Sequence, residues 1–233
     1  MSGGVPRVLF EGAGVMVVDK PAGVLVIPGR EGGPSLRDTL EASLGRKVFV
    51  VHRLDRDTSG ALVFALDAGV HRALSQAFEA GKVRKRYRAL VEGRLEAPQL
   101  VDAPLVAGRK GRMRVAKPEE PDAKPSRTRV RPVETFASAS LVEAEPLTGR
   151  THQIRVHLLS LGHPLLVDHQ YGREAPLTEA DLGGQGTREV LTRTPLHAAR
   201  VEWPALPGLP ARGVDAPLPA DMQRALELLR AAG

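Results

Sequence analysis

Residues 48–66 read VFVVHRLDRDTSGALVFAL, two apolar runs joined by a short charged segment. The first run, 48–51, and the second, 61–66, are too short for helices and are predicted to be strands, the second of them buried. The joining segment 52–60 contains two Asp, two Arg, one His and one Ser. A turn that only needs solvation rarely carries so many ion-pairing groups, so 52–60 is a candidate functional loop between two strands.

Asp55 is the most informative residue of this loop because it lies between Arg53 and Arg56. Neighbouring guanidinium groups favour the ionised form of a carboxyl group. A carboxylate that is ionised at neutral pH suits a nucleophile or a general base, and does not suit a general acid. The residues alone leave a second interpretation open, in which the loop is a turn with surface ion pairs.

The elements before and just after this loop follow from periodicity and turn residues. Short strands are predicted at 15–18 and 24–27, with a turn at 19–23 between them. Two helices are predicted, each running from a polar N-cap to a glycine stop: Ser35 to Gly45 and Asp67 to Gly81.

The rest of the chain continues to mix strands with helices. Strands are predicted at 87–91, 127–136, 140–145 and 195–203. Thr151 is expected to cap a helix that runs to Leu161, and Asp221 is expected to cap a terminal helix. Residues 96–126 are expected to be irregular or a loosely paired hairpin, and 173–194 give no clear pattern. Because there is no regular βαβ rhythm, the sequence predicts a mixed α+β sheet in one continuous domain.

The composition is that of an ordinary globular protein and excludes several chemistries. Of the 233 residues, 42% are hydrophobic and 26% are charged, and Cys is absent. The absence of Cys excludes disulfides, a Cys nucleophile, Fe–S clusters and every Cys-ligated zinc site. No apolar stretch approaches the roughly 18 to 20 residues that span a bilayer, and residues 1–12 lack the apolar core of a signal peptide. We therefore expect a cytoplasmic protein.

The charge of the chain is positive and clustered. Lys and Arg number 33 against 27 Asp and Glu, which gives a formal net charge of +6. Residues 82–88 (KVRKRYR) hold five cations in seven positions, and 109–131 hold nine more. Clustered cations favour a polyanionic partner such as a nucleic acid, because they displace the counterions of its phosphates. The alternative is a merely solvated basic face.

A second polar constellation is 147–157, which reads LTGRTHQIRVH. If a helix begins here, Arg155 lies near its N-terminus, where the macrodipole favours acidic and not basic side chains. A specific acidic partner would explain the position of Arg155, and Asp55 is the natural candidate. Alternatively, the stem of Arg155 covers apolar surface while its head group reaches water.

Other kinds of catalytic site find little support in the sequence. Four histidines and one acid could be drawn as a metal site: His152, His157, His163, His169 and Asp168. No pair of these histidines has the i, i+4 spacing of a zinc-binding helix. Ser59 lacks a GxSxG elbow. Gly12-Ala-Gly14 precedes a strand and lacks the third glycine of a dinucleotide-binding fold, and no P-loop is present.

Five segments, in order along nearly the whole chain, resemble the catalytic domain of the RluA-type family of RNA pseudouridine synthases. They are VMVVDKPAGVLVIPG (15–29), HRLDRDTSGALVFA (52–65), KRYRALVEG (85–93), LTGRTHQIRVHLLSLGHPLLVDHQYG (147–172) and LHAARVEWP (196–204). HRLDRDTSG and TGRTHQIRVH are each highly specific, and both are present with a KRY segment between them.

The resemblance implies an α+β fold with a mixed, mostly antiparallel central sheet flanked by helices, and the isomerisation of uridine to pseudouridine in structured RNA, ribosomal or transfer. Asp55 resembles the catalytic aspartate, which either attacks the sugar C1′ or abstracts a ribose proton. Tyr87 resembles the tyrosine that stacks on the uracil and takes the C5 proton, and Arg155 the basic residue that pairs with the aspartate. Arg53 resembles the arginine that fills the space left by the flipped nucleotide. Such extrusion of a base costs a few kcal/mol.

The residues around these positions are expected to contact the RNA. They are Arg53, Arg56, Lys82, Arg84, Lys85, Arg86, Arg150, His152 and Gln153. Because Tyr87 lies inside the basic cluster, base stacking and phosphate neutralisation are expected to be adjacent.

No cofactor and no metal are expected, since breaking the glycosidic bond, turning the base and rejoining it through carbon is redox-neutral. The chain is expected to act as a monomer, away from membranes, with a single catalytic domain over 1–233. It is expected to lack the N-terminal S4-type module of many relatives, so that 96–126 and 173–194 would select the RNA. Two other functions remain open on the residues alone: an RNA-binding module with an inactive site, and a metal-dependent nuclease or phosphodiesterase.

Overall fold

A computed structural model of the protein describes residues 4–29 and 32–232. The chain forms two compact units, one of Met1–Lys85 with His197–Pro217 and the other of Arg86–Leu196 with Leu218–Gly233. Each unit contributes strands and helices and has its own hydrophobic core. No helix within these described residues has the length and the apolar character that crossing a membrane requires.

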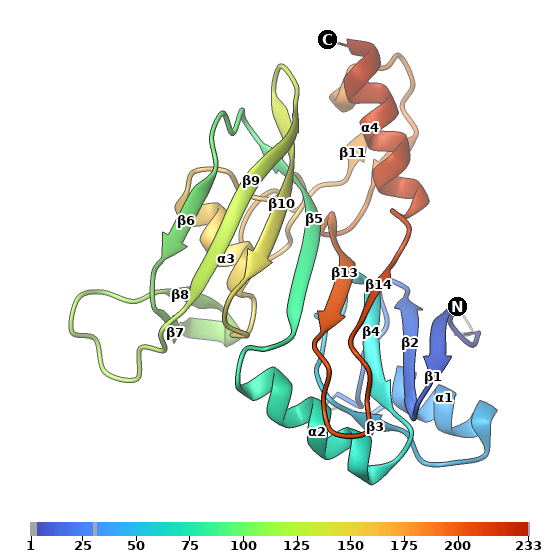
Figure 1. Cartoon of the computed structure of the whole chain (residues 1–233). Coiled ribbons are helices and arrows are strands. Elements are labelled where there is room, and N and C mark those ends of the chain that lie inside the picture. Colours follow the sequence, from blue (N-terminus) through green and yellow to red (C-terminus); the bar gives the residue numbers. More distant parts are fainter. Residues whose placement is uncertain (1–3, 30–31, 233) are drawn as a thin grey trace. The chain divides into compact units, whose positions relative to one another are not determined.

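The first unit is built on a sheet of mixed direction. Its strands are β1 (Val8–Gly12), β2 (Val15–Lys20), β3 (Phe49–Val50), β4 (Ser59–Ala65), β13 (Leu196–Trp203) and β14 (Arg212–Asp215). β1, β2, β4 and β13 are neighbours in that order, β3 pairs with β4, and β14 pairs with β13 (Figure 1). β4 and β13 run parallel, whereas the other described pairs are antiparallel. The strands predicted on both sides of the 52–60 loop are thereby confirmed.

Two helices of the first unit begin and end as their sequences predict. α1 (Leu36–Leu44) starts after Ser35, whose side chain accepts a hydrogen bond from the Asp38 amide, and ends at Gly45 in the left-handed conformation. α2 (Ala68–Glu79) starts after Asp67, whose carboxylate accepts from the Val70 amide. Both N-caps satisfy backbone donors that a helix cannot satisfy itself.

The strand predicted at 24–27 is absent, and that prediction is wrong. In its place, the carbonyl oxygens of Leu25 and Val26 accept hydrogen bonds from the amides of Leu36 and Arg37, at 2.8 and 3.2 Å. The carbonyl oxygens of this segment therefore accept hydrogen bonds from the first turn of α1 and not from a neighbouring strand.

The second unit contains a fully antiparallel arrangement of four strands. They are β5 (Arg84–Glu92), which starts just before the unit, β6 (Gln99–Asp102), β9 (Arg127–Thr135) and β10 (Ala139–Pro146). β5, β10, β9 and β6 are neighbours in that order, as Figure 1 shows. The strands predicted at 87–91, 127–136 and 140–145 are confirmed, and with them the mostly antiparallel α+β fold class.

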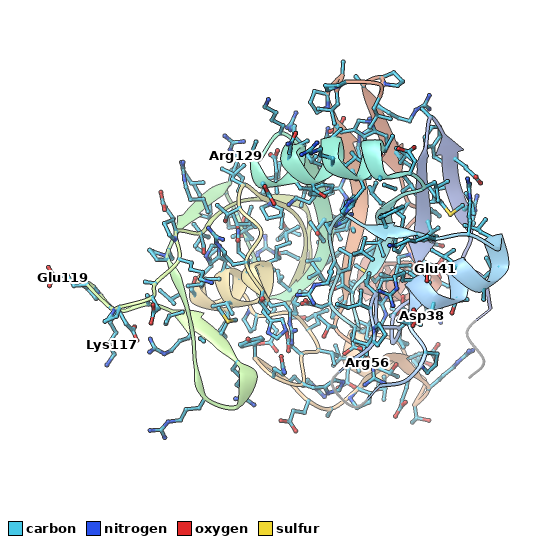
Figure 2. The ribbon with its side chains drawn as sticks, turned by 90° about the horizontal axis from the view of Figure 1, so that it is seen from below. Asp38, Glu41, Arg56, Lys117, Glu119 and Arg129 are labelled. Carbon is cyan, nitrogen blue, oxygen red and sulfur yellow. The ribbon has the colours of Figure 1, made fainter. Side chains whose placement is uncertain are left out.

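The predicted loosely paired hairpin within 96–126 is also confirmed. β7 (Leu105–Ala107) and β8 (Met113–Val115) pair antiparallel, with a single turn of 3₁₀ helix, η1 (Arg109–Gly111), between them. The residues that follow β8 leave the hairpin, and Figure 2 shows Lys117 and Glu119 in the part that extends from it. This hairpin carries several cations of the second basic cluster.

Two more helices belong to the second unit, and the sequence misplaces both N-caps. α3 (Gln153–Ser160) is preceded by His152, which has φ +54° and makes no side-chain capping bond, so Thr151 is not the cap. α4 (Ala220–Ala232) already includes Asp221 in its first turn. The Asp221 carboxylate instead accepts two bonds from Arg193, at 2.7 and 3.0 Å. In α4 the side chain predicted to cap the helix is thus engaged in a tertiary contact.

The remaining elements of the second unit are short and support α4. They are β11 (Leu177–Thr178), η2 (Ala180–Leu182) and β12 (Glu189–Leu191). Leu182 and Leu191 from this segment share a core with Met222 and Leu226 of α4 and with Leu90 of β5. The stretch 173–194, which has no clear pattern in sequence, thus holds the terminal helix.

Candidate active site

The loop 52–60 connects β3 to β4, and a buried lysine holds its shape. Lys20, at the end of β2, is 0% exposed. Its Nζ donates hydrogen bonds to the carbonyl oxygens of Pro21, Arg56 and Thr58, at 2.9, 2.9 and 2.8 Å. An ammonium has three donors, and a buried one is tolerated when they are satisfied. Lys20 therefore fixes the backbone on the C-terminal side of Asp55.

The end of the loop is fixed on β13. Gly60 has φ +110°, and an added Cβ would lie 2.8 Å from the backbone nitrogen of Ala198 and closer still to its carbonyl oxygen. Only glycine allows this approach of two strands. Beside it, Ser59 Oγ lies 2.9 Å from Nδ1 of His197, and both residues are buried. The loop thus enters β4 at a single defined position.

Within the loop, Asp55 is half-buried, while Arg53 and Arg56 are exposed. The turn 21–23 braces Arg56 through two bonds. The Gly23 amide donates to the Arg56 carbonyl at 2.9 Å, and Arg56 Nε donates to the Gly23 carbonyl at 3.2 Å. Figure 2 labels Arg56. The backbone bonds that fix the loop at Arg56 and Thr58 thus lie on the C-terminal side of Asp55.

His52, the first residue of the loop, is a neutral imidazole that contacts α2 and β4. Its imidazole stacks on Phe78 of α2 with centroids 4.5 Å apart, and Nε2 accepts from the Val63 amide at 3.0 Å. Burial, followed by the charge of Lys85, lowers the pKa of His52 to about 3. Burial also lowers the pKa of Lys85, whose Nζ lies 5.8 Å from the Phe78 centroid. Lys85 therefore packs on α2, whereas Lys82 and Arg84 are exposed.

The alternation of β5 separates Tyr87 from Arg86. Successive side chains of a strand point to opposite faces, so Tyr87 lies on one face and Arg86 and Arg88 on the other. Tyr87 is 8% exposed, and Arg88 Nη1 lies 2.9 Å from a carboxylate oxygen of Glu143 on β10. Arg86 therefore lies on the face of Glu143, opposite to that of Tyr87, and the expected contact of Arg86 with RNA stays a prediction.

The face of the sheet that carries Tyr87 is the face that α3 covers. Tyr87 lies opposite Ala144 of β10, which lies opposite Val130 of β9. Thr128, two residues before Val130, points to the same side and bonds to α3 through its Oγ1. The partners of that Oγ1 are Gln153 Nε2 at 2.9 Å and His157 Nδ1 at 2.8 Å. Tyr87 and the helix that carries Arg155 therefore share one side of the sheet.

Gln153 organises the chain before α3 and is 3% exposed. Its Oε1 accepts from Thr148 Oγ1 at 2.7 Å and from the Arg150 amide at 3.0 Å. Its Nε2 donates to Thr128 and to the Arg127 carbonyl, both at 2.9 Å. A buried amide with both ends occupied by the chain has a structural role, and the expected contact of Gln153 with RNA stays a prediction. Arg150 itself is exposed.

Arg155 forms a two-point ion pair with Asp168. Its Nε donates to Oδ2 at 2.8 Å and its Nη2 to Oδ1 at 2.6 Å, with side chains 9% and 1% exposed. Burial alone would raise the pKa of Asp168, but the bonds and charge of Arg155 and the amides of Gln170 and Tyr171 outweigh it and lower the pKa. Such a fork fixes the plane of the guanidinium.

Sequence reasoning missed this role of Asp168. The acid follows the buried residues Leu165, Leu166 and Val167, and an acid directly after such a run can serve as a buried anchor. That pattern was a usable signal, although it does not name the partner. The pairing predicted between Arg155 and Asp55 stays a prediction.

Tyr171 completes the surroundings of Arg155. The guanidinium carbon of Arg155 lies 4.8 Å from the centroid of the Tyr171 ring. The Tyr171 hydroxyl accepts from the Met113 amide at 2.7 Å and lies 2.8 Å from Nδ1 of His152. His152, expected to contact RNA, is half-buried against this ring.

Three of the histidines drawn as a metal site, His152, His157 and His163, have other partners. His157 is 0% exposed and lies between Thr128 and the Ala103 carbonyl, and burial lowers its pKa. His163 Nδ1 lies 2.8 Å from the Glu92 carbonyl. Among residues 4–29 and 32–232, no group of three or more His, Asp or Glu side chains is placed to hold a metal.

Comparison with known proteins agrees with the fold. The family model of RNA pseudouridylate synthases matches residues 14–160. Ribosomal large subunit pseudouridine synthase D of Nitrosomonas europaea is 37% identical over 233 residues, which are 96% of this chain and 65% of that protein. Ribosomal large subunit pseudouridine synthase C of Vibrio cholerae is 36% identical over 233 residues, 97% of this chain and 70% of that protein. This chain thus spans about two thirds of the length of either relative.

A solved structure, human RNA pseudouridylate synthase domain containing 4, has a TM-score of 0.78 at 27% sequence identity and covers 96% of this chain and 92% of its own. The family match spans more than half of the chain and contains the loop 52–60, β5 and α3. The protein is therefore a member of the RNA pseudouridine synthase family, as its resemblance to the RluA-type enzymes predicts.

Proposed function

We propose that this chain isomerises uridine to pseudouridine in large-subunit ribosomal RNA. The N1–C1′ glycosidic bond breaks, the uracil turns, and a C5–C1′ bond forms. C5 loses its proton and N1 gains one, so the exchange is balanced without an oxidant, a reductant or an activated donor. The choice of ribosomal over transfer RNA rests on the names of the two bacterial relatives.

The observation that supports the proposal most directly is that Tyr87 and α3 lie on the same side of the sheet in the second unit. The register of β5, β10 and β9 puts Tyr87 on the face to which α3 is bonded through Thr128. An aromatic face for a base and a cation for developing negative charge are thus supplied from one layer. The family match adds the loop with Asp55.

We assign the catalytic roles as follows from the family resemblance. Asp55 starts the reaction, by attack on C1′ or by abstraction of a ribose proton. Tyr87 stacks on the uracil and takes the C5 proton, and Arg155 pairs with the aspartate. Arg53, which is exposed, fills the space of the flipped nucleotide. The proposal requires that one uridine meets all of these groups.

The RNA-contact set is drawn from the exposed cations of these segments. Exposed members are Arg53, Arg56, Lys82, Arg84 and Arg150. His152 remains in the set as a group beside the site, and Lys85 and Arg86 as flanking charges that are less accessible. Phosphate contacts of this kind set affinity and position, whereas the pocket around the flipped base sets selectivity.

The proposed enzyme acts as a monomeric catalytic domain in the cytoplasm, where ribosomal RNA is modified. Size-exclusion chromatography with light scattering tests the monomer. A dimer peak at micromolar protein would reject that part of the proposal and leave the activity untouched.

The activity is tested with Asp55→Asn beside Asp57→Asn, the same chemical change in the same loop. An unmodified transcript of the organism's large-subunit rRNA, tritiated at C5 of uridine, releases tritium once for each isomerised uridine. We expect release from wild type and Asp57→Asn, and none from Asp55→Asn, which should still bind the transcript. Equal release from wild type and Asp55→Asn would reject the role of Asp55, and pseudouridine mapping in a deletion strain would identify the site.

A further inference from the structure

Tyr171 is one of only two tyrosines in the chain, and three groups of the second unit converge on it. Its ring covers the guanidinium of Arg155, and its hydroxyl meets the Met113 amide and His152. The family match at 14–160 ends before Tyr171 and contains its three partners.

The ring of Tyr171 gives Arg155 a second contact besides Asp168. The two bonds that Arg155 donates to Asp168, at 2.8 and 2.6 Å, hold one edge of the guanidinium. The aromatic ring, with its centroid 4.8 Å from the guanidinium carbon, occupies the space beside the head group and favours the cation. The ion pair and the ring together restrain Arg155.

The hydroxyl of Tyr171 restrains two further elements. It accepts the Met113 amide at 2.7 Å and so ties β8 to the segment that follows Asp168. It also lies 2.8 Å from Nδ1 of His152, whose backbone has φ +54°. A non-glycine residue in that region needs support from its surroundings. A phenol can accept one bond and donate another, so one hydroxyl serves both contacts.

The element tied by Met113 is the basic β7–β8 hairpin. Its Arg109, Arg112 and Arg114 are exposed, and Arg114 pairs with Glu120. α3 packs against β8. A phosphate bound by these arginines would therefore contact the hairpin whose strand β8 is hydrogen-bonded to Tyr171. Tyr171 in turn contacts Arg155.

We propose that Tyr171 is a positioning residue with two separable roles: its ring orients Arg155 for the reaction, and its hydroxyl holds the β7–β8 hairpin in place to receive RNA. The inference rests on the proposed function of Arg155. It extends that function by naming the residue that connects RNA binding at the hairpin to the guanidinium.

The two roles are separated by Tyr171→Phe and Tyr171→Leu, assayed with the tritiated rRNA transcript. Tyr171→Phe keeps the ring, so kcat should stay within about 2-fold of wild type while KM rises about 5-fold, the effect of one hydrogen bond. Tyr171→Leu loses the ring as well, and kcat should fall about 10-fold further. Ser160→Ala, which removes a hydroxyl at the far end of α3, is the matched control and should leave both constants unchanged.

A second measurement does not depend on activity. Amide hydrogen exchange at Met113 should accelerate at least about 5-fold in Tyr171→Phe, because its acceptor is gone. Unchanged exchange at Met113, or equal loss of kcat in the Phe and Leu variants with unchanged KM, would overturn the proposal. If wild type releases no tritium from the transcript, the proposed function fails, and the exchange result alone then decides whether Tyr171 holds the hairpin.

Discussion

Lys20 Nζ lies 2.8 Å from the carbonyl oxygen of Thr58, 38 residues away in sequence. With its bonds to Pro21 and Arg56, this contact makes the shape of the 52–60 loop depend on the end of β2. The position of Asp55 is thus set by a cation that is 0% exposed and is distant from it along the chain.

Lys20→Met should damage both stability and activity. Methionine fills a similar volume but leaves three carbonyl oxygens without their donor, and each buried unsatisfied acceptor costs about 1 to 3 kcal/mol. We expect the free energy of unfolding in urea to fall by about 3 kcal/mol, with tritium release reduced at least about 10-fold even in the folded fraction. Lys82→Met, at an exposed lysine, should change stability by less than about 0.5 kcal/mol. Equal stability of the two variants would contradict this role of Lys20.

Gly60→Ala should be more harmful than a change at a comparable glycine elsewhere in the first unit. Gly60 and Gly208 both have positive φ, at +110° and +72°, but only Gly60 has neighbouring atoms within 4 Å of an added Cβ. Gly208→Ala should lower the free energy of unfolding by about 1 kcal/mol through backbone strain alone. Gly60→Ala should lower it by about 3 kcal/mol or more, because β4 and β13 must also separate. Urea unfolding of both proteins makes the comparison, and similar losses would show that the contact with Ala198 is unimportant.

Local signals in the sequence predicted most elements of this fold. Ser35 and Asp67 each carry a side chain that accepts from the amide three residues on, which is a purely local interaction. The predictions that are wrong concern segments whose hydrogen bonds go to a group that is distant in sequence. Leu25 and Val26 give their carbonyls to α1, and Asp221 gives its carboxylate to Arg193. Neither partner can be identified from the local pattern.

In the candidate site, too, local features can be predicted from the sequence, whereas contacts formed by folding cannot. The charged loop around Asp55 is visible in sequence because its residue types are unusual between two apolar runs. The partner of Arg155 could not be found that way, since Asp168 meets it only through folding of the second unit. The separation of Tyr87 from Arg86, in contrast, follows from strand alternation and was available in the sequence.

His52 should make stability depend on pH in mildly acidic solution. Its pKa is about 3 in the folded protein and about 6.5 in the unfolded chain. As pH falls below about 6.5 the unfolded chain binds this proton first, so the folded state loses up to about 1.4 kcal/mol per pH unit down to about pH 3. His52→Gln keeps an acceptor for the Val63 amide and cannot take that proton. Urea unfolding between pH 6.5 and 4.5 should show a shallower decline for the variant, and an identical decline would mean that His52 is protonated in the fold.

The exposed cations Lys82 and Arg84, at the start of β5, should contribute to RNA binding through phosphate contacts. Replacing Lys82 and Arg84 together by Ala should weaken binding of the rRNA transcript. It should also reduce the steepness of the fall of log K with log salt by about 1.4 to 1.8, at about 0.7 to 0.9 per phosphate contact. The matched control is Arg129→Ala with Arg131→Ala. It removes the same charge from the face of β9 that points away from α3. Those arginines face Glu145 and Glu143, at 3.6 and 2.8 Å, and Figure 2 labels Arg129.

The control separates local contact from general electrostatics, because both double variants reduce the net charge by two. If RNA binding were driven by net charge alone, both would flatten the salt dependence equally. We expect the control to keep most of the wild-type slope, since its arginines already neutralise two glutamates and lie on the face away from Tyr87. Equal slopes for the two variants, measured by filter binding from 50 to 300 mM salt, would therefore remove Lys82 and Arg84 from the RNA-contact set.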